Sequence, residues 1–337
     1  MNTQHTLFDR IYGPVKLTEP VLIALINSRA MQRLQGVSQH GISALVQITA
    51  PVSRFEHSTG AMLLVRRWGG SLEEQIAALL HDVSHTAFSH VIDYVFDGHN
   101  DQSYHDRVKE TYVAQTDLPA ILTRFGYEWR AVLDEKRYSL LEQPAPALCA
   151  DRLDYFLRDS LDLHLSTPDT IRHVLDHLIV HEGRIMTDNR TENYAVARWL
   201  AYTYIAADDA SWANFREVGL YEVCAQAIRL GLDRGVITED DFWGEDIALW
   251  RKLHAAADPD LRAQLALVSP ATRFIRDDAA PDFRVSTKIR TIDPDVVVDG
   301  AARPLSTLDA EFAAYRAAYV ARKTGKWPVR VIAPPKH

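Results

Sequence analysis

The sequence predicts a mainly helical protein with a small α+β region at its C-terminal end. Apolar residues recur at intervals of three and four through most of residues 18–267, the spacing of an amphipathic helix. The composition changes at about residue 268, and within residues 269–300 three prolines and alternating β-branched residues replace that periodicity. We therefore expect a helical domain over residues 1–267 and a small α+β region over residues 268–337, with enough chain to bury a large core.

The first helix is expected from Glu19 to about Gly36. Thr18 precedes Glu19 and Pro20, which is typical of an N-cap followed by an acidic first turn, and VLIALINSRAMQRLQG continues the periodicity. Further helices, separated by glycine-containing breaks, are expected over residues 57–69, 72–82, 85–96 and 104–114.

The second half of the chain is expected to combine helices with short strands. Apolar positions recur at helical spacing between Pro144 and Leu163, and Pro168 suits the first turn of a helix over residues 168–181. The stretch VHEGRIMT is typical of two extended arms joined at Gly183. The remaining predictions are two helices within 190–233, short helices from Thr238 and Pro259, strands within 282–300, a helix over 308–324 and a strand over 328–333.

Composition indicates an ordinary globular protein, with 47% hydrophobic and 24% charged residues. Its net charge of −8 argues against a surface built for duplex nucleic acid. Apolar runs are far shorter than the roughly 18 residues of a membrane helix, and MNTQHTLFDRIYG lacks the pattern of a signal peptide. We expect a cytoplasmic protein with no membrane partner, whose two cysteines are buried, reduced thiols.

Histidines concentrate between residues 57 and 105, a stretch that holds six of the fourteen. In LLHDVSHTAFSH, His81 and His85 are four residues apart, so a helix would present them on one face, and Asp82 adds a carboxylate. A divalent ion at a catalytic centre needs mixed nitrogen and oxygen ligands, which this segment begins to supply. His57 and Asp151 are candidates for the rest, although each alone also suits a purely structural role.

The motifs RFEHS, LLHDVSHTAFSH and DRLDYFLRD, in this order and spacing, resemble the signature of HD-domain phosphohydrolases. The resemblance is closest to the branch that contains the deoxynucleoside triphosphate triphosphohydrolases and the vertebrate SAM-and-HD-domain protein, and it spans residues 8–165. It implies a helical HD-domain core that binds one divalent metal ion (Mn, Fe, Mg, Ni, Co or Zn) through His57, His81, Asp82 and Asp151. It also implies a small-molecule nucleotide substrate and a homo-oligomer.

The same resemblance implies roles for other polar residues. His105 would lie near the scissile phosphate, with Asp106 orienting it, and His85 and His90 would contact the phosphates. The nucleoside side of the pocket would be lined by Gln39, Arg54, Tyr155 and Asp159. Arg152 would be a basic residue that contacts a phosphate. The chemistry is independent of any family: a divalent ion lowers the pKa of bound water from about 15.7 towards about 7. The histidines and Arg152 would supply positive charge or protons to the phosphate and leaving group.

One stretch departs from the family pattern. The triphosphohydrolases carry basic side chains on a helix after the second aspartate, whereas residues 199–212 here contain no Arg, Lys or His and include Asp208 and Asp209. A triphosphate near two uncompensated carboxylates would cost Coulomb energy. Two substrates therefore stay open: a deoxynucleoside triphosphate cleaved at the α-phosphate, which we favour slightly, and a smaller ester such as a nucleoside monophosphate.

Two hypotheses belong to other classes. A non-catalytic nucleotide sensor would be indicated by a missing metal ligand, yet all four candidates are present. Single-stranded nucleic-acid binding would need basic and aromatic side chains along one groove. The basic clusters are more simply explained as solvated helix faces, namely Arg66-Arg67 and the set Arg316, Arg322, Lys323 and Lys326. We therefore expect an enzyme and no nucleic-acid partner.

Overall fold

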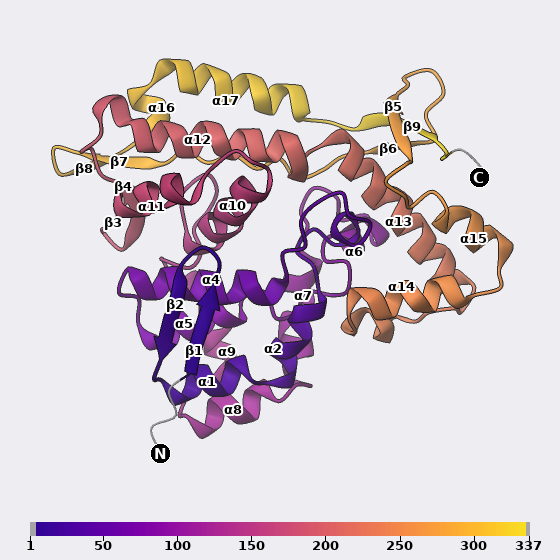
Figure 1. Cartoon of the computed structure of the whole chain (residues 1–337), viewed down its shortest axis with the longest axis horizontal. Coiled ribbons are helices and arrows are strands. Elements are labelled where there is room, and N and C mark those ends of the chain that lie inside the picture. Colours follow the sequence, from indigo (N-terminus) through magenta and orange to yellow (C-terminus); the bar gives the residue numbers. More distant parts are fainter. Residues whose placement is uncertain (1–4, 335–337) are drawn as a thin grey trace.

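Figure 1 shows the computed structural model of the chain, which describes residues 5–334. The first four residues of the predicted helical domain and the last three of the predicted α+β region lie outside it. Helices predominate, as expected, and the strands of the described residues form one two-stranded, one four-stranded and one three-stranded sheet. The fold is therefore rich in helix without being all-helical.

The N-terminal part begins with an antiparallel hairpin of β1 (His5–Asp9) and β2 (Gly13–Leu17). The single helix predicted up to Gly36 is split into α1 (Pro20–Ile26) and α2 (Arg29–Arg33). Ser28 causes the break, because its hydroxyl accepts from the Met31 amide and starts a new helix. The predicted N-cap at Thr18 is also wrong, since Glu19 occupies that position.

The centre of the fold is α4 (Arg54–Arg67), which packs against α5 (Leu72–Leu80) and α10 (Ala150–Asp162). The first turn of α4 is fixed by a capping box in which Ser53 and Glu56 each accept from the other's backbone amide. Other helices of this part are α3 (Ile42–Leu45), α7 (Tyr104–Val113), α8 (Leu118–Arg124) and α9 (Trp129–Val132).

Gly60 allows α4 and α10 to approach closely. A Cβ atom at this position would lie 1.9 Å from Asp154 Oδ1 and 2.2 Å from a guanidinium nitrogen of Arg158. Any larger residue would force α10 away from α4. Because His57 lies on α4 and Asp151 on α10, this contact sets the distance between two of the predicted metal ligands.

The helix predicted over residues 72–82 ends earlier than expected. α5 stops at Leu80, and residues 81–90 form turns, so the prediction that His81 and His85 share one helix face is wrong. Within these turns Phe88 and Ser89 have φ values of 62° and 48°, in the left-handed region that a continuing helix does not allow. The helix resumes only as α6 (Val91–Val95).

The helix predicted over residues 168–181 is also shorter than expected. α11 (Pro168–Asp176) gives way to β3 (Leu178–His181), which pairs with β4 (Arg184–Thr187) across the turn predicted at Gly183. The two helices predicted within residues 190–233 are confirmed as α12 (Ala195–Ala207) and α13 (Phe215–Asp233), and they are followed by α14 (Asp246–Ala255) and α15 (Pro259–Leu265).

Strands and helices after residue 268 join the helical part at two places (Figure 1). One sheet has the order β3-β4-β7-β8, and the other has the order β5-β9-β6 and contacts α13. The helix α17 runs beside α12. The bounds of these elements are β5 (Arg273–Arg276), β6 (Phe283–Val285), β7 (Asp295–Val298), β8 (Ala301–Pro304), α16 (Leu305–Leu308), α17 (Ala310–Lys323) and β9 (Trp327–Ile332).

Two expectations about the whole chain can be compared with the fold. Both cysteines, Cys149 and Cys224, are buried and free, as predicted. Among the described residues, none of the helices combines the length and the apolar character that crossing a membrane requires.

Candidate metal centre

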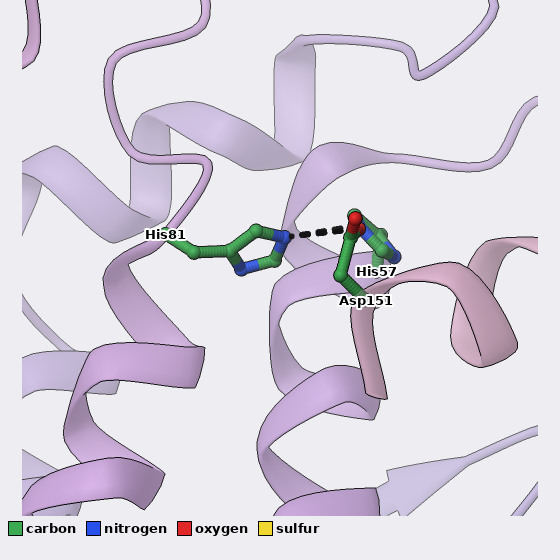
Figure 2. A group of neighbouring side chains, drawn as sticks. All are labelled: His57, His81 and Asp151. Atoms are coloured by element: carbon green, nitrogen blue, oxygen red, sulfur yellow. Dashed lines mark hydrogen bonds and ion pairs between the residues drawn. The ribbon is translucent and has the colours of Figure 1, made fainter. Parts of the chain in front are cut away.

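Two imidazoles and a carboxylate from three different elements meet in the interior (Figure 2). His57 Nε2 lies 3.0 Å from Asp151 Oδ1 and 3.1 Å from His81 Nε2. His81 Nε2 lies 3.4 Å from the same carboxylate oxygen. Two imidazole nitrogens and one carboxylate oxygen this close together form a group that could hold a divalent ion.

The second nitrogen of each imidazole already has a hydrogen-bond partner. His57 Nδ1 lies 2.8 Å from Asp154 Oδ2, and His81 Nδ1 lies 2.7 Å from the carbonyl oxygen of Ala78. Both partners are acceptors, so Nδ1 carries a proton and Nε2 is the nitrogen that faces the centre of the cluster and could ligate an ion. The donor set therefore fits a metal ion, with second partners that hold each ring in orientation.

Asp82, the fourth predicted ligand, lies next to these three residues. Its Oδ2 is 3.5 Å from His57 Nε2, and its Oδ1 is 3.7 Å from His81 Nε2. Arg54 Nη1 donates to Asp82 Oδ2 over 2.5 Å. The structure thus brings all four predicted ligands together, with Asp82 shared between the cluster and Arg54.

Opposite charges within the cluster shift the pKa values of its members. Burial lowers the pKa of His81, but Asp82 and Asp151 outweigh it and the pKa becomes about 10. Burial raises the pKa of Asp82, yet Arg54 and His81 hold it well below its usual range. In the metal-free cluster the histidines therefore retain protons that an ion must displace, so metal binding is expected to release protons.

A second group of histidines adjoins the cluster. His85 Nε2 is 3.2 Å from Asp82 Oδ1, and the His85 ring stacks on His105 with ring centroids 3.8 Å apart. The His90 ring centroid lies 5.0 Å from that of His85. Burial lowers the pKa of each of the three, that of His90 to about 4. These lowered pKa values favour the neutral imidazole, which supplies hydrogen bonds to a ligand more readily than positive charge.

His105 and Asp106 occupy the first turn of α7. His105 Nε2 is 3.4 Å from Asp106 Oδ1, which also accepts from Lys109 Nζ over 3.2 Å. His105 Nδ1 is buried and has no hydrogen-bond partner among the described residues. The His105 side chain itself lines the adjacent cavity.

The metal cluster, by which we mean the four predicted ligands His57, His81, Asp82 and Asp151, lies in the wall of a cavity of about 1000 Å³. Every residue predicted for the site lines this cavity, including Gln39, Arg152, Tyr155 and Asp159. Arg152 Nη2 donates to Glu142 over 2.7 Å, and the hydroxyls of Tyr155 and Tyr204 are hydrogen-bonded to each other. The side-chain oxygen of Gln39 is buried without a partner among residues 5–334.

Asp159 is held at one end of this cavity by two partners that were not predicted. His40 Nε2 lies 2.9 Å from Asp159 Oδ1, and Trp212 Nε1 donates to Oδ2 over 2.6 Å. Glu217 lines the same end, and burial raises its pKa to about 7. This end is thus polar and aromatic, and it differs in character from the histidine-rich wall.

The acidic residues at 208–209 are not uncompensated, so that part of the sequence-based argument is wrong. Asp208 accepts from the Tyr319 hydroxyl over 2.8 Å and from the Arg290 backbone amide over 3.1 Å. Asp209 forms an ion pair with Lys323 at 2.5 Å. These partners come from the C-terminal region, which also contributes three basic residues to the cavity wall, namely Lys288, Arg290 and Arg316.

Sequence reasoning missed two kinds of site residue. Asp154 follows Asp151 by three residues on one helix, and this spacing alone would have suggested that both serve the same site. His40, Arg290 and their neighbours reach the cavity only through tertiary packing, and no local pattern marks them.

Comparisons with known proteins agree with this geometry. The HD domain family model matches residues 54–159, a range that contains all four predicted ligands. Over 324 residues the chain is 36% identical to the metal-dependent phosphohydrolase cns2 of Cordyceps militaris, covering 94% of this chain and 92% of that protein. The chain belongs to the HD-domain family of metal-dependent phosphohydrolases.

Other proteins are similar to this chain over different lengths. An uncharacterized protein of Bacillus subtilis, YdhJ, is 39% identical and matches 86% of this chain and 88% of its own. The human deoxynucleoside triphosphate triphosphohydrolase SAMHD1 is 34% identical over 108 residues, 28% of this chain and 17% of that protein. The solved structure of a phosphohydrolase from Bacteroides thetaiotaomicron shares the fold, with a TM-score of 0.68, 15% identity and coverage of 96% and 99% of the two chains.

Proposed function

We propose that this chain hydrolyses nucleotides, and that its substrate is a deoxynucleoside triphosphate cleaved at the α-phosphate into nucleoside and triphosphate. The observation that carries the proposal is the position of His57, His81 and Asp151 in the wall of a cavity of about 1000 Å³, beside His85 and His105. A cavity of this volume is in the range of sites for small organic ligands. The partial similarity to SAMHD1, named as a deoxynucleoside triphosphate triphosphohydrolase, supports the choice of substrate.

A divalent ion at this site supplies Lewis acidity and makes a hydroxide nucleophile available from water near neutral pH. The chain's own residues hold the site for that chemistry. Asp154 orients His57, and Arg54 orients Asp82, each through a short hydrogen bond. We assign His105 as the proton carrier, because its Nδ1 has no partner among the described residues and its ring stacks on His85.

The nucleoside is assigned to the aromatic end of the cavity. The rings of Tyr155 and Trp212 lie edge to face with centroids 5.0 Å apart, and Asp159 holds the Trp212 indole. Gln39 adds a buried oxygen that lacks a partner among the described residues. Aromatic faces and a free acceptor are groups that suit a base or sugar.

A nucleoside monophosphate is the second candidate substrate, and ion pairing near the cluster favours it. Arg152 is paired with Glu142, and Lys109 is paired with Glu135 and Asp106. These paired side chains offer little net charge to further phosphates, whereas the two negative charges of a monophosphate match those of one divalent ion.

A product assay across nucleoside mono-, di- and triphosphates, in ribo and deoxy forms, tests the proposal. The protein is loaded in turn with Mn, Mg, Co, Ni or Fe, and the release of nucleoside, inorganic triphosphate and orthophosphate is measured. We expect triphosphate and nucleoside in equal amounts from a deoxynucleoside triphosphate. Orthophosphate from monophosphates alone would establish the second candidate. No product with any ion would overturn both and favour the sensor.

A further inference from the structure

We propose that Lys288, Arg290 and Arg316 form a cationic subsite that binds the phosphate tail of a polyphosphate ligand. All three line the cavity that contains the metal cluster, and all three come from the C-terminal region. The inference rests on the proposed function, which sets the orientation of the ligand. The phosphate ester to be cleaved lies at the predicted metal ligands, and the further phosphates extend towards the subsite. It assigns the recognition of the phosphate tail to a part of the chain outside the matched HD domain.

The three side chains differ from Arg54, Lys109 and Arg152 of the same wall in having no carboxylate partner. Arg54, Lys109 and Arg152 each form an ion pair with a neighbouring carboxylate. Within residues 5–334, no ion pair involves the side chains of the proposed subsite, which are Lys288, Arg290 and Arg316. Cationic groups on a cavity wall without counter-charges are suited to an anionic ligand.

The backbone of the subsite is held in place by buried groups. Asp208 is fully buried and accepts from the Arg290 amide over 3.1 Å, so the chain is anchored directly beneath this side chain. One Arg290 guanidinium nitrogen donates to the side chain of Gln102, and Arg316 Nε donates to Thr291 Oγ1 over 3.0 Å. Each guanidinium keeps further N–H groups free, and its orientation is fixed before a ligand arrives.

Lys288 lines the same cavity as the predicted metal ligands, and its side chain is exposed. An Arg290 guanidinium nitrogen donates to the Lys288 carbonyl oxygen over 3.3 Å. This bond holds the two residues close together on the cavity wall, which suits a pair of cations that contacts neighbouring phosphates.

Charge balance indicates how many phosphates the subsite accommodates. A phosphate group carries a charge of about −1.5 to −2 at pH 7, which one divalent ion can neutralise. Three additional cations are in excess for a monophosphate. They match the charge that a second and a third phosphate would bring into the cavity.

Binding of inorganic tripolyphosphate and of orthophosphate to the full-length, metal-free protein tests the subsite by calorimetry. We expect tripolyphosphate to bind more tightly than orthophosphate, and K288A and R290A each to weaken tripolyphosphate about tenfold, the loss of one charge-assisted contact. Arg303→Ala is the matched control, because Arg303 is exposed on β8 and does not line the cavity. Its affinity should equal that of the wild type. K288A alters an exposed side chain, so it remains informative if R290A fails to fold.

The result that overturns the subsite is equal affinity of K288A, R303A and wild type for tripolyphosphate, or no preference of the wild type for tripolyphosphate over orthophosphate. This outcome is separable from failure of the proposed function. If the wild type hydrolyses triphosphates and K288A binds tripolyphosphate normally, only the subsite falls. If no nucleotide is hydrolysed but K288A loses tripolyphosphate binding, the subsite stands and the proposed function falls.

Discussion

Asp154 accepts a hydrogen bond from Nδ1 of His57 over 2.8 Å, and both side chains are buried. The Asp154 carboxylate also accepts from Tyr12 and Arg158. A predicted metal ligand on α4 is thus oriented by a carboxylate on α10 that is itself fixed from two directions. Such second partners set which nitrogen of an imidazole faces the ion.

Asp154→Asn should lower metal affinity by about 10- to 100-fold, the usual effect of losing a carboxylate partner of a ligating histidine. The reason is that an amide cannot hold the His57 proton as firmly, so Nε2 becomes a weaker ligand. Chelator competition with the purified variant measures the change. Asp169→Asn, on an exposed residue, serves as the control. Unchanged affinity in D154N would show that His57 does not depend on this partner.

His105→Ala should leave the metal in place and slow turnover by about 10²- to 10⁴-fold, the range for a lost acid or base. His105 stacks on His85 but does not belong to the His57, His81 and Asp151 group. Metal content and kcat are measured on the same preparation. A variant that loses its metal would instead identify His105 as a ligand.

Glu217→Gln should change how stability depends on pH. Burial raises the pKa of Glu217 from 4.5 to about 7. The folded state therefore holds its proton more tightly than the unfolded state, and the stabilisation present below about pH 4.5 is lost as pH rises to about 7. A pKa shift of this size corresponds to a change of about 3 kcal/mol in the free energy of unfolding. Urea unfolding at pH 5 and pH 8 should show a smaller difference in E217Q than in wild type; equal differences would contradict the buried, protonated carboxyl.

Tyr319→Phe should destabilise the protein by about 1–3 kcal/mol, because it removes a buried donor from Asp208. Tyr319 lies on α17 and Asp208 follows α12, so the bond ties the C-terminal helix to the helical part. Tyr315→Phe, on the same helix but 44% exposed, is the matched control. Denaturant unfolding of the two variants gives the comparison, and equal stabilities would mean that this bond contributes nothing to docking α17.

The sequence predicted which helices surround the predicted metal ligands better than it predicted where those helices begin and end. Helical spacing located α4, α10, α12 and α13, because each buries several apolar residues. It failed after Leu80, where His81 to His90 continue a plausible periodicity but form turns. The histidines reach the cavity from this irregular segment through contacts with distant residues such as Arg54, which no local pattern describes.

The sequence predicted which residues lie together where they share a motif, and it did not predict residues that reach the cavity through long-range packing. His57, His81, Asp82 and Asp151 could be named from the sequence because their residue types and order match a metal-binding signature. The interpretation of Asp208 and Asp209 failed, since their partners lie more than eighty residues further along the chain. The interpretation of Arg316 as part of a solvated helix face is likewise wrong, because Arg316 lines the cavity wall.

The most direct test of the central claim compares the wild type with the H81A/D82A double variant, in both metal content and nucleotide hydrolysis. The claim is that this cluster binds the ion on which phosphohydrolase activity depends. We predict that wild-type protein loaded with a divalent ion hydrolyses a nucleotide, and that the double variant keeps its helical circular dichroism but loses both the ion and all turnover. Wild-type turnover in the folded double variant would contradict the claim.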